Sequence, residues 1–145
     1  MLYEIRFDVN PRSASRPRFT KSGHTYLAGP YKEFRKEMDV LCEDLLGDFE
    51  PLEGPLSVST KLFVTRPKTT KLYAPKSDID NYLKAVWDSL NGKVWEDDRQ
   101  ITDVAETCKR WTIEPGMPGR IELSIERPID FEQDENGTWR ERTNR

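Results

Sequence analysis

The alternation of apolar and polar residues predicts strands near both ends of the chain and in its middle. Apolar residues occupy every second position over Tyr3–Val9, which is typical of a half-buried strand. The same period recurs over Leu56–Val64 and Ile121–Ile125. A further strand is expected over Ile101–Ile113, before a tight Pro/Gly-rich connection.

Two other segments carry apolar residues at helical spacing. The first begins at Gly29-Pro30, with proline in the first turn, and ends at Gly47. Its apolar stripe consists of Tyr31, Phe34, Met38, Leu41 and Leu45. The second helix is expected from about Ile79 to Leu90, with Asn91-Gly92 as its stop.

The order of these elements predicts the fold class. Strand, loop, helix, strand, loop, helix, strand and strand fit a two-layer α+β domain, in which two main helices pack on one face of a small mixed β-sheet. A chain of 145 residues is long enough for one core, and we expect a single domain over residues 1–127. Residues 128–145 are polar with few aliphatic side chains and are expected to form a frayed C-terminal tail.

The composition argues against membrane-spanning, secreted, disulfide-rich and zinc-binding classes of protein. No apolar run is long enough for a transmembrane helix, and the first residues are charged rather than like a signal peptide. Cys42 and Cys108 lie far apart and outside any Cys-x-x-Cys pair, so they predict neither a disulfide framework nor a zinc site. These features favour a reduced, cytoplasmic protein without membrane association.

A net charge of −3 conceals separate blocks of charge. Val9–Lys36 carries seven basic residues and one acid, residues 37–53 carry seven acids and no base, and Lys61–Lys76 is again basic. Clustered Lys and Arg on loops are typical of proteins that bind polyanions, although surface charges also cluster by chance. The residues expected to contact phosphates are Arg12, Arg16, Arg18, Lys21, Lys68, Lys71 and Lys76.

Acidic residues around the second helix are candidate metal ligands. Residues two apart share a face only on an extended chain, so Asp78 and Asp80 can converge if Asp78 precedes the helix. Lys84 lies one helical turn after Asp80. Mg²⁺ takes one or two carboxylates and keeps waters for phosphate oxygens, which suits phosphodiester hydrolysis. Asp97 and Asp98 would close the site from the other side, and only one of them would be a ligand if the pair lies in a strand.

A purely structural explanation of the same residues stays open. Ser77-x-x-Asp80 fits a capping box, and acids at a helix start suit the helix dipole. Asp80 and Lys84 could form a plain i,i+4 ion pair, and Asp97-Asp98 could be only a turn.

Three consecutive motifs carry a resemblance to a known family. The chain reads Lys76-Ser77-Asp78-Ile79-Asp80-Asn81-Tyr82-Leu83-Lys84, then Asp88-Ser89-Leu90-Asn91-Gly92, then Asp97-Asp98-Arg99-Gln100-Ile101. In this order and spacing it resembles the RusA family of Holliday-junction resolvases, small endodeoxyribonucleases common in phages and prophages. A basic loop after the first strand, Thr25-Tyr26 and Lys109 extend the resemblance to roughly residues 3–126. Ser77 departs from the usual proline, which removes a rigid lead-in to Asp78, and Tyr82 departs from the usual leucine.

The resemblance implies a Mg²⁺-dependent nuclease, with Mn²⁺ as a substitute, that acts in DNA recombination and repair. Such an enzyme resolves four-way junctions by paired nicks, as a homodimer on branched DNA. Asp78, Asp80 and the pair Asp97-Asp98 resemble the metal ligands, with Asp98 favoured within the pair, and Lys84 resembles the catalytic lysine. The catalytic set is therefore expected to be Asp78, Asp80, Lys84 and Asp98. The alternative is a non-catalytic nucleic-acid-binding module on the same scaffold, which the intact set of acids disfavours.

Overall fold

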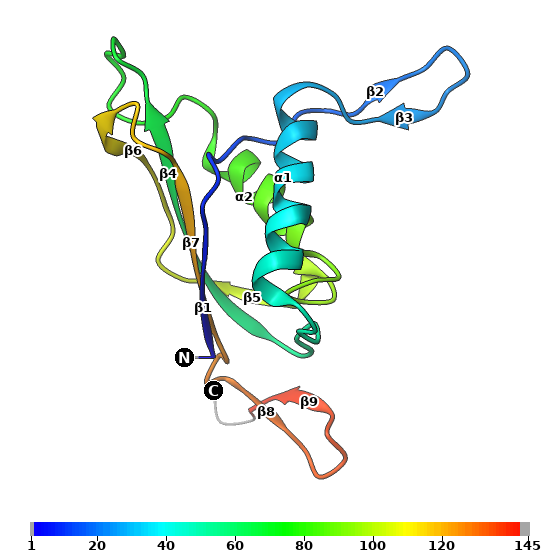
Figure 1. The fold of residues 1–145 in the computed structure, drawn as a ribbon. Coiled ribbons are helices and arrows are strands. Elements are labelled where there is room, and N and C mark those ends of the chain that lie inside the picture. Colours follow the sequence, from blue (N-terminus) through cyan, green and yellow to red (C-terminus); the bar gives the residue numbers. More distant parts are fainter. Residues whose placement is uncertain (1, 143–145) are drawn as a thin grey trace.

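The longest strand, β4 (Leu56–Arg66), lies inside the sheet of the computed structural model, which describes residues 2–142 (Figure 1). Every second residue of its apolar stretch is buried, so one face of β4 packs into the core. β7 (Arg120–Glu126) pairs antiparallel with one edge of β4, and β1 (Tyr3–Phe7) pairs antiparallel with β7. β5 (Ile101–Val104) and β6 (Cys108–Pro115) pair parallel with the other edge of β4. The predicted mixed sheet is confirmed.

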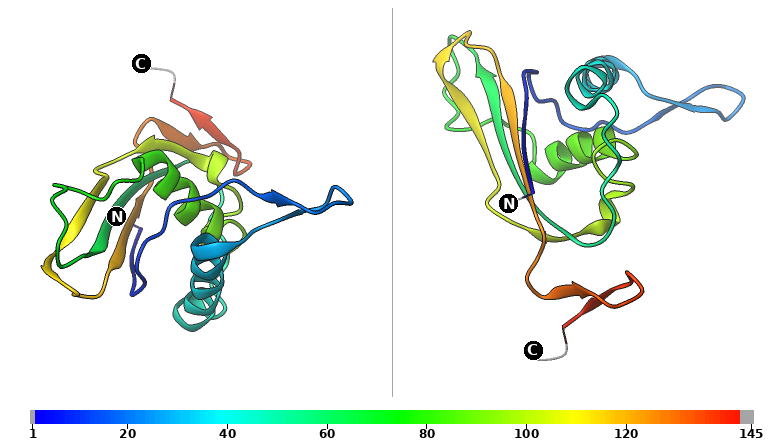
Figure 2. Two further views of the ribbon diagram at one scale, coloured as in Figure 1. Left: turned by 90° about the horizontal axis from the view of Figure 1, so that it is seen from above. Right: turned by 60° about the horizontal axis from the view of Figure 1, so that its bottom comes forward.

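The two predicted helices, α1 (Gly29–Leu46) and α2 (Ile79–Leu90), lie on the same side of this sheet (Figures 1 and 2). α1 ends at Gly47, whose φ of 52° is easily adopted by glycine. Along α1, Cys42 is buried, whereas Leu45 of the predicted stripe is 51% exposed. The two-layer α+β architecture is confirmed, and neither helix has the length and apolar character needed to cross a membrane.

The strand expected over Ile101–Ile113 is in fact two strands, and this prediction was wrong. Val104 pairs with Val58 and Cys108 pairs with Lys61, so three residues between these pairs on one side oppose two on β4. The extra residue interrupts the ladder as a bulge does, and a bulge leaves the alternating pattern nearly intact. At the break, the hydroxyl of Thr107 donates a hydrogen bond to the carbonyl of Ala105 (2.8 Å).

Two small hairpins lie outside the main sheet (Figure 1). The first, β2 (Arg18–Phe19) with β3 (Thr25–Tyr26), extends away from the body of the protein in every view (Figures 1 and 2). It falls within the basic loop that the sequence predicts between the first strand and the first helix. Its strands are exposed along their whole length. Residues of this hairpin are therefore available for contact with a large partner.

The second hairpin, β8 (Phe131–Gln133) with β9 (Trp139–Glu141), replaces the frayed tail expected after residue 127. The guanidinium of Arg127 lies 4.6 Å from the centre of the Trp139 ring, and it donates a hydrogen bond to the Pro55 carbonyl (3.0 Å). These contacts fix the hairpin to the loop before β4. A cation over an aromatic ring and a charge-assisted hydrogen bond are both stabilising, so this polar segment is ordered although it has few aliphatic side chains.

We expect Gly54→Ala to destabilise the protein by about 1–3 kcal/mol more than Gly116→Ala, because of overpacking. Both glycines have positive φ, 79° and 77°, so both variants carry similar backbone strain. A Cβ on Gly54 would lie 2.3 Å from Nε1 of Trp139, whereas nothing lies within 4 Å of one on Gly116. Urea unfolding of the two variants measures the difference. Equal losses of stability would contradict the close packing of Trp139 on this loop.

Candidate functional site

Asp78 and Asp80 lie at the start of α2, and both are exposed. Asp78 is the N-cap residue with extended backbone (φ −63°, ψ 143°), as the sequence predicts, and Asp80 lies in the first turn. The alternative capping box from Ser77 to Asp80 is not formed, because no side chain caps this helix. The hydroxyl of Ser77 instead accepts a hydrogen bond from Ser13 (3.0 Å). Neither carboxylate is therefore used to cap α2.

Asp97 and Asp98 lie at the start of a short 3-10 helix, η1 (Asp98–Gln100), and have different roles. Asp97 is its N-cap: its carboxylate accepts a hydrogen bond from the Arg99 amide (2.9 Å), and its own amide donates to the Gln100 side chain (2.9 Å). This capping box uses Asp97 as a structural residue. Asp98 has no such capping role, so it is the better ligand candidate of the pair.

Lys84 contacts Asp88 rather than Asp80. Its Nζ lies 3.1 Å from Oδ2 of Asp88, one turn further along α2. The plain Asp80–Lys84 ion pair, which the structural explanation offered, is therefore not formed. The spacing alone could not distinguish the two, since both acids lie four residues from Lys84 on one helical face.

The charges of the Lys84–Asp88 ion pair affect the pKa of Asp98 in η1. Burial raises the pKa of Asp98, and its hydrogen bond with Asp97 and the negative charges of Asp88 and Asp97 raise it further, whereas Lys84 lowers it. The pKa of Lys84 is raised mainly by its hydrogen bond with Asp88 and by the charge of that carboxylate. Asp98 therefore feels the negative charges of Asp88 and Asp97 and the positive charge of Lys84.

The chemistry of these donors suits a hard divalent cation. Carboxylates crowded together disfavour their own ionisation, and a cation removes that penalty. Within residues 2–142, no three Asp, Glu, His or Cys side chains are already grouped closely enough to hold an ion. The acids of α2 and η1 thus provide ligands of the right type, on two separate elements.

The basic segment after β1 passes directly over the start of α2. The amide of Ala14 donates a hydrogen bond to the carbonyl of Asn81 (2.9 Å), and Ser13 donates to Ser77. The positive charge of Arg12 also acts on the hydroxyl of Tyr82, lowering its pKa against the larger effect of burial, which raises it. A positively charged loop therefore lies next to the acids of α2.

The seven predicted phosphate contacts are exposed side chains from two parts of the chain. They comprise Arg12, Arg16, Arg18 and Lys21 around the β2–β3 hairpin, and Lys68, Lys71 and Lys76 between β4 and α2. None of them forms an ion pair with an acid of residues 2–142. Exposed cations without acidic partners are suited to phosphate groups.

Three residues outside the predicted catalytic and metal-binding set take part in the site. Asp88 holds the amine of Lys84, and its i,i+4 spacing was the available signal. Gln100 closes the capping box and also donates to the Leu52 carbonyl (2.8 Å), which joins η1 to the loop before β4. The third, Lys109, bonds to the chain just before Asp78. No pattern along the sequence reveals these long-range contacts.

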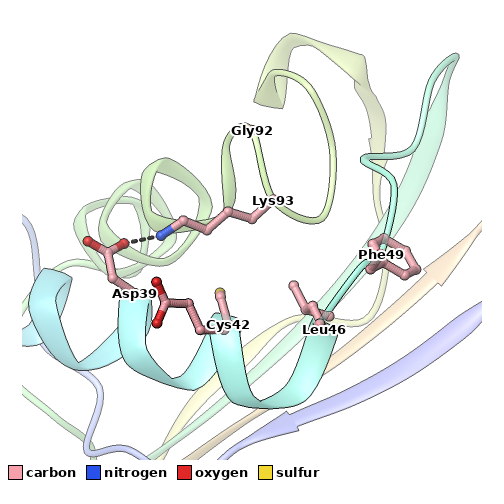
Figure 3. A pocket seen from close by; sticks show the side chains of 8 residues that line it. Asp39, Cys42, Leu46, Phe49, Gly92 and Lys93 are labelled. Carbon is pink, nitrogen blue, oxygen red and sulfur yellow. Dashed lines mark hydrogen bonds and ion pairs between the residues drawn. The ribbon is translucent and has the colours of Figure 1, made fainter.

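One pocket of the surface lies elsewhere, between α1 and the turn after α2 (Figure 3). Asp39, Cys42, Leu46 and Lys93 contribute to its walls, and Lys93 pairs with Asp39 across it. Burial raises the pKa of the Cys42 thiol, so this thiol is a poor nucleophile. None of the candidate acids lines the pocket, and the site instead occupies open surface accessible to a polymer.

In the absence of metal, we expect Asp98→Asn to make the protein more stable at pH 7. A raised pKa means that the folded protein holds this proton more tightly than the unfolded chain. Ionisation of Asp98 therefore costs stability at neutral pH, and the cost disappears as the pH falls through the raised pKa. Thermal unfolding in EDTA should show a gain at pH 7 that diminishes toward pH 4. Asp130→Asn, in the exposed segment before β8, is the control, and a gain independent of pH would contradict the assignment.

Comparison with known proteins places the chain in a family. The model of the family described as endodeoxyribonuclease RusA matches residues 8–126, from the end of β1 to the end of β7. The uncharacterized protein YqaN of Bacillus subtilis (strain 168) is 29% identical and is matched over 83% of this chain and 94% of its own length. The matched range includes both helices and all the candidate acids, and the β8–β9 hairpin lies outside it. The chain therefore belongs to the RusA family of endodeoxyribonucleases, which act on Holliday junctions.

Proposed function

We propose that this protein is a Mg²⁺-dependent endonuclease that resolves four-way DNA junctions by paired phosphodiester nicks. The observation that supports this proposal is the hydrogen-bonded pair of Lys84 and Asp88 on α2, whose charges act on Asp98 of η1. Asp78 and Asp80 lie at the start of the same helix. These residues lie within the range matched by the endodeoxyribonuclease family.

Asp78, Asp80 and Asp98 are the proposed ligands of the metal. When bound, Mg²⁺ supplies a water of lowered pKa and neutralises charge on the phosphate. Asp97 is a weaker candidate, because its carboxylate already accepts the Arg99 amide. Mn²⁺ has similar ligand preferences and is expected to substitute.

Lys84 is proposed to stabilise the negative charge that develops on the phosphate or on the departing oxygen. Asp88 holds this amine in place and raises its pKa, so Lys84 stays protonated at neutral pH. A protonated lysine can donate a proton or a hydrogen bond, but it cannot serve as a base. Its side chain is 65% exposed, so a DNA strand can reach it.

The projecting β2–β3 hairpin and the loop before α2 are proposed to bind the DNA arms. They carry Arg18 and Lys21, and Lys68 and Lys71, respectively. The hairpin projects beyond α1, and the loop before α2 lies on the opposite side of α2, near β4 and β6 (Figure 1). Since a junction must be cut on two strands, two copies of the site are needed, and we propose that the protein acts as a homodimer.

We expect Asp80→Asn to reduce cleavage of a synthetic four-way junction by about 100-fold or more, since metal stabilisation of the transition state is worth several kcal/mol. Binding to the junction should change little, because Asp80 contacts the metal rather than the DNA. Cleavage assays and gel-shift titrations test this, with Asp130→Asn as the control. Full cleavage by the Asp80 variant would refute the assignment. Wild-type protein that binds junctions but makes no nicks at any Mg²⁺ concentration would favour the non-catalytic alternative.

Removing the two positive charges of the β2–β3 hairpin should make the affinity for a junction less sensitive to salt. Each lost phosphate contact changes the slope of log K against log[salt] by about 0.9, so Arg18→Ala with Lys21→Ala should reduce it by about 1.8. Lys36→Ala is the matched control, because this exposed lysine of α1 is paired with Glu33 (3.9 Å). An unchanged slope in the double variant would exclude the hairpin from the DNA interface.

A further inference from the structure

Two side chains on one face of β6 donate hydrogen bonds to the loop that leads into α2. The ammonium of Lys109 donates hydrogen bonds to the carbonyls of Pro75 (2.8 Å) and Ser77 (2.6 Å). Two residues further along the strand, the indole of Trp111 donates to the carbonyl of Leu72 (3.0 Å). Residues two apart on a strand share a face, so Lys109 and Trp111 act on the loop from the same side.

The lysine acts on the chain immediately before the first proposed metal ligand. The carbonyl of Ser77 belongs to the peptide unit that joins Ser77 to Asp78, and Asp78 must stay extended for its carboxylate to lie on the side of Asp80. Serine at position 77 leaves the backbone torsion φ free, whereas a proline would restrict it. The structure therefore requires another restraint at this position.

Further hydrogen bonds to the same residue are weaker substitutes for that restraint. Ser13 donates to the hydroxyl of Ser77 (3.0 Å), and the Ser77 side chain is also hydrogen-bonded to Tyr82. Both bonds engage the side chain of Ser77, which can rotate. Within residues 2–142, Lys109 is the side chain that bonds to the Ser77 backbone. It holds two carbonyls, those of Pro75 and Ser77, from a strand that is itself paired with β4.

We propose that Lys109 is a positioning residue for Asp78, because its hydrogen bonds restrain the backbone that leads into Asp78 and that serine at position 77 leaves free to rotate. This inference rests on the proposed metal site. Because the ammonium bonds to main-chain oxygens, it leaves the carboxylate oxygens of Asp78 available to a cation. Its two carbonyl bonds use two of the three donors of the amine.

The test is the affinity of the Lys109→Met variant for Mn²⁺. Methionine keeps an unbranched side chain of similar length and removes the hydrogen-bond donors. Loss of a residue that orients a ligand typically costs about 10-fold to 100-fold in metal affinity. We expect the Mn²⁺ concentration at half-saturation, measured by electron paramagnetic resonance without DNA, to rise by that factor. Junction affinity in EDTA should stay within about twofold of wild type, and Lys109→Arg, which keeps donors, should lie between the two proteins.

Proline at position 77 provides a rescue that a general loss of stability would not show. In the Lys109→Met background, Ser77→Pro should restore most of the Mn²⁺ affinity, because proline fixes φ of residue 77, one of the torsions between the two carbonyls that Lys109 holds. Thermal unfolding of each variant verifies that it is folded. A Lys109→Met protein that binds Mn²⁺ as tightly as wild type would overturn the inference.

Other outcomes separate this inference from the proposed function. Weaker junction binding by Lys109→Met in EDTA, with a smaller salt slope and no rescue by proline, would show that Lys109 contacts phosphate instead, and it would overturn the positioning role. If wild-type protein neither binds Mn²⁺ nor cuts junctions, the metal-dependent function itself fails. If wild type does both and only the lysine variant is unaffected, the function stands and the positioning role fails.

Discussion

Repulsion among carboxylates is the constraint on which the rest of the site depends. Asp98 is held where burial and the charges of Asp88 and Asp97 all disfavour its ionisation. Lys84 offsets part of this repulsion, since it bonds directly to Asp88 and attracts Asp98 at longer range. A fold that merely needed stability would place neutral side chains here, so the excess of negative charge is the feature that the proposed cation and phosphate would account for.

Hydrogen bonds from side chains to main-chain carbonyls hold the segments that carry these acids, and they leave the carboxylate oxygens available. Gln100 holds η1 against the loop before β4 through the Leu52 carbonyl, and Lys109 holds the lead-in to α2. In both cases the donating side chain and the accepting carbonyl belong to segments distant in sequence. Two elements that are each fixed to the sheet can therefore present Asp78 and Asp98 without a direct contact between the acids.

The sequence predicts the elements of this fold better than their contacts. The bounds of α2 follow from apolar spacing and the Asn91-Gly92 stop, because both are local properties. The break between β5 and β6 was missed, since one added residue hardly changes an alternating pattern. The β8–β9 hairpin was missed because its stability comes from Arg127 and Trp139 against a distant loop. In the site, residue types predicted the acids, but only three-dimensional contacts separate Asp97 as a cap from its neighbour.

Paramagnetic relaxation by Mn²⁺ tests most directly whether one ion joins the two acidic elements. The amide signals of ¹⁵N-labelled protein near a bound Mn²⁺ broaden before all others as the ion is titrated. The account predicts that signals of Asp78–Asp80 and of Asp98 broaden together at the same low Mn²⁺ concentration, and that Asp98→Asn weakens both effects. Broadening confined to one of these segments, or spread evenly over the acidic surface of residues 37–53, would contradict a shared metal site.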